Sequence, residues 1–192
     1  MRQKKILVLS VPAIIVLGID QLTKWIIRTT PELQSKTLID GWLEFYYTQN
    51  PGMAMGIDWL PTPVISGVAI LATMGILIYL IRSLDKASIG YLAFMGLIIG
   101  GALGNISDRI FMGYVYGNGG VLEGHVIDFI YFSLRINDWT VFPYIFNVAD
   151  IAISVSIISL LVFNKRLLQH DGVVESEESN NATEVADSPS QA

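Results

Sequence analysis

The sequence contains no cysteine, only two histidines and few charged residues for its length. Without cysteine, the chain cannot form disulfides, use a thiolate nucleophile or build a cysteine metal site. The two histidines do not form the His-Glu-x-x-His pattern of zinc proteases, and no Gly-x-Ser-x-Gly motif supplies an activated serine. We therefore expect no metal and no cofactor, and the carboxylates remain as the main candidates for chemistry.

Charge is scarce along most of the chain. Of the 192 residues, 15% are charged and 52% are hydrophobic, a balance typical of a membrane protein. Residues 1–170 are nearly neutral, with 12 bases and 11 acids, so no basic face for nucleic acid is expected. The last 22 residues hold six acids and no base, and segment 166–192 is predicted to be a disordered acidic tail.

Four apolar stretches have about the 20 residues that a helix needs to cross a bilayer. They cover residues 6–27, 60–81, 89–111 and 143–163. The first can be read as a cleaved signal peptide. Its length, the acid and base inside it and the lack of a small-residue cleavage site favour a retained span. We predict an all-α membrane protein with four transmembrane helices over residues 1–165.

The basic residues predict how these spans are oriented, because cytoplasmic loops are enriched in lysine and arginine. Seven bases flank one side and three flank the other. We therefore expect both termini in the cytoplasm, and segments 28–59 and 112–142 outside. The seven are Arg2, Lys4, Lys5, Arg82, Lys86, Lys165 and Arg166, and the three are Arg28, Lys36 and Arg135.

Polar residues gather at the predicted outer ends of three spans. Ionisable groups inside spans are costly and indicate function by default. The first span carries an acid and a base four residues apart, hence on one helix face. The residues concerned are Asp20, Lys24, Asn105, Asp108, Arg109, Asn147 and Asp150.

Each of these groups also has a purely structural interpretation. The acid and base of the first span can form an ion pair that neutralises itself. The acid and the base of the third span can lie in the headgroup layer of the membrane. Asn147 and Asp150 have the spacing of a helix cap, with the carboxylate at the positive helix end. None of these alternatives explains why three helices place polar groups at one depth.

Glycines recur every four residues along the third span, at Gly96, Gly100 and Gly104. Small residues at this spacing let helices approach closely in lipid. We interpret them as packing residues.

Two outer segments add further candidates. Segment 123–134 is a mostly apolar run with one carboxylate, Asp128, and it is too short to span, so we place it at the membrane interface. Segment 41–57, rich in aromatics and glycine, predicts short strands joined by a turn at Asn50-Pro51-Gly52. Asp128 and Asp150 flank one short loop. Two carboxyls at close range tend to share one proton, and such a pair can hydrolyse an amide.

Five motifs in order make the chain resemble lipoprotein signal peptidase, over residues 6–165. They are DQLTK (20–24), NPGMAMG (50–56), GGALGNISDR (100–109), VIDF (126–129) and FNVAD (146–150). The resemblance implies a four-helix aspartyl protease of the bacterial inner membrane, with its site near the outer face. Such an enzyme cuts the signal peptide from a prolipoprotein just before a diacylglyceryl-modified cysteine, and globomycin blocks it. It implies no nucleic-acid partner, and we expect a monomer among membrane lipids.

Carried over residue by residue, the resemblance makes Asp128 and Asp150 the catalytic pair. It also implies a small outer sheet at 41–57 that cradles substrate, and a loop with a short amphipathic helix before Asp128 that covers the site. Gly52 and Ala54 would leave room for a peptide backbone. The other site or supporting positions are Asp20, Lys24, Asn50, Asn105, Asp108, Arg109, Asn147 and Ala149.

Two departures from the family leave the covering loop uncertain: Met55 stands where phenylalanine is common, and segment 113–125 is long and glycine-rich. Two other functions compete with the protease. A proton-coupled carrier would place its carboxylates near the membrane midplane, between internal repeats. A non-enzymatic assembly factor would need only capped helices, and Asp-to-Asn changes should leave it working.

Overall fold

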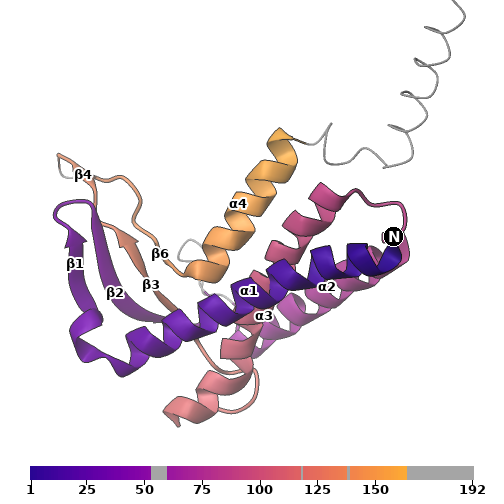
Figure 1. Cartoon of the computed structure of the whole chain (residues 1–192). Coiled ribbons are helices and arrows are strands. Elements are labelled where there is room, and N and C mark those ends of the chain that lie inside the picture. Colours follow the sequence, from indigo (N-terminus) through magenta and orange to yellow (C-terminus); the bar gives the residue numbers. More distant parts are fainter. Residues whose placement is uncertain (53–59, 118, 138, 164–192) are drawn as a thin grey trace, which may run out of the picture.

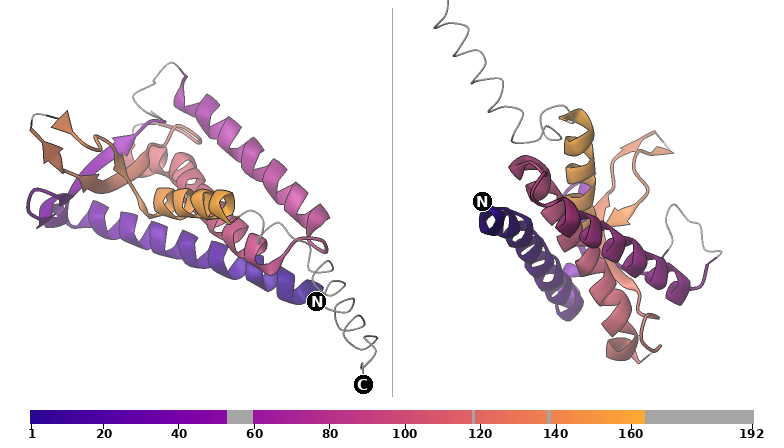
Figure 2. Two further views of the ribbon diagram at one scale, coloured as in Figure 1. Left: turned by 90° about the horizontal axis from the view of Figure 1, so that it is seen from above. Right: turned by 90° about the vertical axis from the view of Figure 1, so that its right-hand side faces the viewer.

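The structure, a computed structural model, describes residues 1–52, 60–117, 119–137 and 139–163. Its long helices gather beside a sheet that lies at the end of α1 away from the N-terminus (Figure 1). The view from above also shows the sheet at this end of α1 (Figure 2, left). Within these ranges the four α-helices are α1 (Arg2–Thr29), α2 (Thr62–Ser83), α3 (Ile89–Tyr116) and α4 (Val148–Val162).

Three of the four helices, α1, α2 and α3, are long and apolar enough to cross a membrane. The fourth, α4, has 15 residues and starts at Val148, so the predicted start near Pro143 is wrong. The physical reason is local: Ile145 and Phe146 pair with another strand as β6, and Asn147 caps the helix. A fourth complete span therefore stays a prediction.

The glycines of α3 let α1 approach closely. A Cβ at Gly96 or Gly100 would collide with the backbone oxygens of Leu9 or Ala13, and one at Gly104 would collide with the carboxylate of Asp20. The predicted packing role is confirmed. It also brings the polar end of α1 directly against α3.

The sheet is antiparallel, with the strand order β1-β2-β3-β6. Its central strand β3 (Val126–Phe132) is buried over its first four residues, with Ile127 and Phe129 packed against Ile27 of α1. Most of segment 123–134 therefore pairs inside a sheet, and its place at the membrane interface stays a prediction. The other strands are β1 (Ser35–Ile39), β2 (Leu43–Asn50) and β6 (Ile145–Phe146), and a separate hairpin joins β4 (Arg135–Ile136) to β5 (Trp139–Thr140).

The strand predicted within 41–57 is confirmed by β2, and the chain bends at Pro51 and Gly52. The rest of that segment lies outside the described residues. A short 3₁₀ turn, η1 (Pro31–Leu33), leads from α1 into β1.

The connection from α3 to β3 is a loop. α3 continues to Tyr116, beyond the expected end at 111, and ends at Gly117, whose φ of 65° suits glycine. No helix occurs among the described residues between Tyr116 and Val126, so the expected amphipathic helix is wrong there. The loop instead folds back onto α3, because the Gly124 amide donates to the Arg109 carbonyl at 3.0 Å and Gly124 has no room for a side chain.

Candidate active site

Asp128 projects from the buried part of β3 and is held by two side-chain amides. Asn50 Nδ2 donates to one carboxylate oxygen at 2.9 Å, and Asn147 Nδ2 donates to the other at 2.7 Å. The Gly52 amide donates to Asn50 Oδ1 at 2.9 Å, which orients the Asn50 amide nitrogen toward Asp128. Burial, reinforced by the charge of Asp150, raises the pKa of Asp128 to about 7.

Asp150 lies in the first turn of α4, where it closes a capping box. Asn147 Oδ1 accepts from the Asp150 amide at 3.0 Å, and Asp150 Oδ2 accepts from the Asn147 amide at 3.1 Å. Asp150 Oδ1 also accepts from Asn105 Nδ2 of α3 at 2.9 Å. The structural interpretation of the Asn147–Asp150 spacing is thus confirmed, and the same carboxylate also joins the polar cluster.

Asn147 connects the two aspartates directly. Its side-chain amide donates to Asp128 and its backbone amide donates to Asp150. A third contact, Nδ2 to Asn105 Oδ1 at 3.1 Å, joins the bridge to α3. Side chains from β2, β3, α3 and the start of α4 therefore meet in one cluster, in which Asp128 and Asn147 are buried.

A second polar layer supports this cluster from α1. Lys24 forms salt bridges with Asp20 at 2.9 Å and Asp108 at 2.8 Å, and all three side chains are buried. The expected ion pair within the first span exists, but it extends to α3. The headgroup interpretation of Asp108 is wrong, because this carboxylate has no exposure and accepts from the Ile127 amide at 3.1 Å.

Arg109 and Gly52 have their contacts outside the carboxylates of this cluster. Arg109 Nη1 donates to the Asn105 carbonyl at 3.2 Å, and its buried Nε has no partner among the described residues. Gly52 has a φ of 120°, and a Cβ there would collide with Ile65 of α2. Packing against α2 therefore explains this glycine without a substrate. Ala54 lies outside the described residues, and Ala149 is fully buried.

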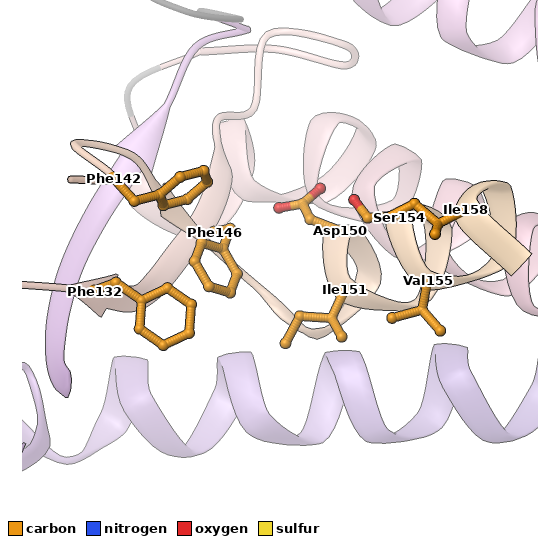
Figure 3. Close-up of a pocket in the computed structure, with 8 residues that line it drawn as sticks. All are labelled: Phe132, Phe142, Phe146, Asp150, Ile151, Ser154, Val155 and Ile158. Atoms are coloured by element: carbon orange, nitrogen blue, oxygen red, sulfur yellow. The ribbon is translucent and has the colours of Figure 1, made fainter. Parts of the chain in front are cut away.

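An apolar pocket of about 300 Å³ opens beside Asp150 (Figure 3). Three phenylalanines form one side and α4 forms the other, with the Asp150 carboxylate between them (Figure 3). The phenylalanine rings contact one another at centroid distances of 5.4 and 5.9 Å. The lining residues are Phe132, Phe142, Phe146, Asp150, Ile151, Ser154, Val155 and Ile158.

Sequence reasoning missed Gln21 and this aromatic group. Gln21 Nε2 donates to Asp108 at 3.0 Å and to the Gly104 carbonyl at 3.1 Å. A polar amide next to Asp20 inside an apolar stretch was the available signal. The phenylalanines carried no comparable signal, because their meeting depends on the pairing of β3 with β6.

The chemistry that this arrangement can support is that of paired carboxylates. A buried aspartate with a raised pKa and a half-buried aspartate beside it can hold one proton between them and act as an acid and a base. Within the described ranges, no group of three or more histidine and acidic side chains could hold a metal ion.

Fold and site together define a helical membrane protein with an aspartate cluster beside a small sheet. Residues 12–165 match the family model described as Signal peptidase (SPase) II. The chain therefore belongs to the signal peptidase II family and is a protease, as its motifs predicted.

Individual relatives cover most of the chain. A lipoprotein signal peptidase of Chlorobium phaeobacteroides is 34% identical over 168 residues, which are 84% of this chain and 92% of the relative. One of Clostridium acetobutylicum is 34% identical over 146 residues, 76% of this chain and 85% of the relative. A bacterial membrane enzyme solved by the in meso method at 2.3 Å resolution is 29% identical, with a TM-score of 0.60, covering 81% of this chain and 86% of its own.

Proposed function

We propose that this protein removes the signal peptide from diacylglyceryl-modified prolipoproteins, as an aspartic endopeptidase that cleaves before the lipidated cysteine. The observation that carries the proposal is the bridge at Asn147, which binds Asp128 through its side chain and Asp150 through its backbone. The names of the relatives and the order of the motifs supply the substrate class.

The two aspartates differ in the way that acid–base hydrolysis requires. Asp150 lies at the positive end of α4 and accepts hydrogen bonds from the side chain of Asn105 and the backbone amide of Asn147. It is suited to take a proton from an attacking water. Burial keeps a proton on Asp128, which is suited to donate to the scissile carbonyl oxygen.

Hydrolysis then proceeds by proton transfer to and from the two aspartates. The water oxygen bonds to the carbonyl carbon, one water proton passes to Asp150, and the proton of Asp128 passes to the carbonyl oxygen. As the C–N bond breaks, Asp150 returns its proton to the leaving amine and the diol returns one to Asp128. Both aspartates regain their starting states without a cofactor.

Other features fit a lipid-anchored peptide substrate. The apolar pocket beside Asp150 suits hydrocarbon next to the scissile bond, and the unbonded Nε of Arg109 can donate to a carbonyl or lipid oxygen. We further propose an inner-membrane location with cytoplasmic termini, an outward-facing site and a monomeric enzyme that globomycin inhibits.

The direct test is cleavage by the purified protein in detergent micelles. A diacylglyceryl-modified prolipoprotein and its unlipidated form are incubated with wild type, Asp150→Asn or Asp85→Asn, and products are followed by mass. Asp85 is an exposed acid in the α2–α3 turn and serves as the matched control. We expect wild type and Asp85→Asn to cut only the lipidated substrate, before its cysteine, and globomycin to stop them.

Asp150→Asn should leave both substrates intact. Equal cleavage of the unlipidated form would contradict the proposed requirement for a lipid-modified substrate. A folded wild type that cuts neither form would restore the carrier and the assembly factor as explanations.

A further inference from the structure

Lys24 has a complete set of partners deep inside the protein. An ammonium group has three hydrogens, and three acceptors surround this one: Asp20 at 2.9 Å, Asp108 at 2.8 Å and Asn105 Oδ1 at 2.9 Å. The side chain is 2% exposed. Water therefore has almost no access to this cation, and its geometry is set by α1 and α3 alone.

Each carboxylate that Lys24 binds also holds the backbone of one catalytic segment. Asp20 Oδ1 accepts from the Ala149 amide at 3.0 Å, and Ala149 immediately precedes Asp150. Asp108 Oδ2 accepts from the Ile127 amide at 3.1 Å, and Ile127 immediately precedes Asp128. The two segments belong to different elements, and Lys24 joins the two carboxylates that hold them.

The third bond of Lys24 fixes the orientation of a catalytic donor. Because the cation binds Asn105 Oδ1, the amide nitrogen of Asn105 must point the other way, where it donates to Asp150 at 2.9 Å. A flipped amide would place its NH₂ group against the ammonium and would leave Asp150 without this donor.

We propose that Lys24 is the positioning residue of the active site, which sets the relative placement of Asp128 and Asp150 through Asp20, Asp108 and Asn105. The importance of this placement for catalysis rests on the function proposed above. The contacts through which Asp20, Asp108 and Asn105 hold the two segments do not depend on that function. Lys24 touches neither aspartate in the described contacts and so acts only through its three partners.

Removal of the lysine should therefore loosen both segments together. Lys24→Met keeps a long side chain but removes every donor, and the two carboxylates then repel each other in a buried site. A displacement of about 1 Å at reacting groups can cost roughly 100-fold in rate. The loss should fall on kcat, because neither the phenylalanines of the apolar pocket nor Arg109 is among the three partners of Lys24.

The chain provides a matched control in Lys5, a second buried lysine of α1. Lys5 Nζ donates to the carbonyls of Asp85 and Ala87 at 3.1 and 2.8 Å, at the opposite end of the helix. Lys5→Met removes the same charge from the same helix, so it reports what loss of a buried lysine does to stability alone.

The experiment measures kcat and KM for the lipidated prolipoprotein, and backbone amide exchange at Ile127 and Ala149, in the same micelles. For Lys24→Met we expect kcat to fall about 100-fold with little change in KM. Exchange at both amides should accelerate about tenfold, because carboxylates that have lost their cation hold these amides less firmly. Lys5→Met should leave kcat and both exchange rates at wild-type values.

A second variant guards against misfolding of Lys24→Met. The combination of Asp20→Asn, Lys24→Met and Asp108→Asn preserves the shape of the triad and leaves no buried charge unpaired. Wild-type kcat in this folded variant, or unchanged exchange at both amides, would overturn the positioning role. If wild type itself does not cleave, the proposed function fails, and the exchange rates still decide whether Lys24 anchors the two segments.

Discussion

The two aspartates of the site are the same side chain in two different settings. Asp128 lies within a buried strand, where both its oxygens accept from side-chain amides. Asp150 lies in the first turn of a helix, where one oxygen accepts a backbone amide and the helix end favours a negative charge. The comparison shows how a fold can separate the roles of two identical residues by their secondary structure.

The difference has a simple electrostatic consequence. A carboxyl group buried in a strand lacks the oriented dipoles of a helix end, so burial favours its neutral form. The pKa of Asp128 accordingly rises to about 7, and the charge of Asp150 contributes to that rise. One proton shared by the pair is expected to reside mainly on the strand residue.

The largest expected effect comes from replacing each aspartate in turn. Asp128→Asn and Asp150→Asn should each reduce cleavage by about 10³-fold, since each removes one acid–base partner. Their stabilities should differ. Asp150→Asn removes the capping carboxylate and should lower the free energy of unfolding by about 1 kcal/mol, whereas Asp128→Asn resembles the protonated side chain.

Thermal unfolding in the same micelles at pH 6 measures this contrast. A similar loss of stability in both variants would remove the distinction between the strand and the helix residue. Retained activity in either variant would remove that residue from the catalytic pair.

The same contrast explains what could be predicted from the sequence. The cap at Asn147 and Asp150 is local, so its spacing could be read directly. Strand β3 could not, because its first half is buried on both faces and shows no alternation of polar and apolar residues. Its pairing with β2 joins Asp128 to Thr48, which are 80 residues apart in the chain.

The helices show the same division between local and distant information. Apolar length predicted α1, α2 and α3, and glycine spacing predicted that another helix approaches α3 closely, which the structure shows to be α1. The link from Lys24 to Asp108 depends on the register between those helices, which spacing within one helix does not define. The start of α4 was misplaced because apolar content does not distinguish a short strand from a helix.

A second prediction concerns the pH dependence of cleavage. Asp128 must carry a proton to act as the acid, so wild-type cleavage should decline as the pH rises above about 7. The hydrogen bond from Asn50 lowers the pKa of Asp128, so Asn50→Ala should move this decline to higher pH. Asn105→Ala removes a donor from Asp150 instead, and should lower the rate about tenfold without moving the decline.

Rates of cleavage between pH 5 and pH 9 test this pair of variants. If the decline in cleavage rate moved to higher pH equally in Asn50→Ala and Asn105→Ala, the Asn50 amide would have no specific effect on the pKa of Asp128. A wild-type rate that is flat across this range would show that the proton of Asp128 is not required.

The smallest expected effect is on the titration of Asp128 itself. Asp150→Asn removes the charge that helps to raise its pKa, so the pKa should fall below about 7, and ¹³C NMR of the Asp128 carboxyl can follow it. Between about pH 4 and the pKa of Asp128 in the folded protein, the folded protein binds a proton that the unfolded chain lacks. The free energy of unfolding therefore falls as the pH rises through this range. That fall should end at lower pH in the variant. An unchanged titration would mean that burial alone holds the proton on Asp128, and that the two aspartates are electrostatically independent despite their shared bridge at Asn147.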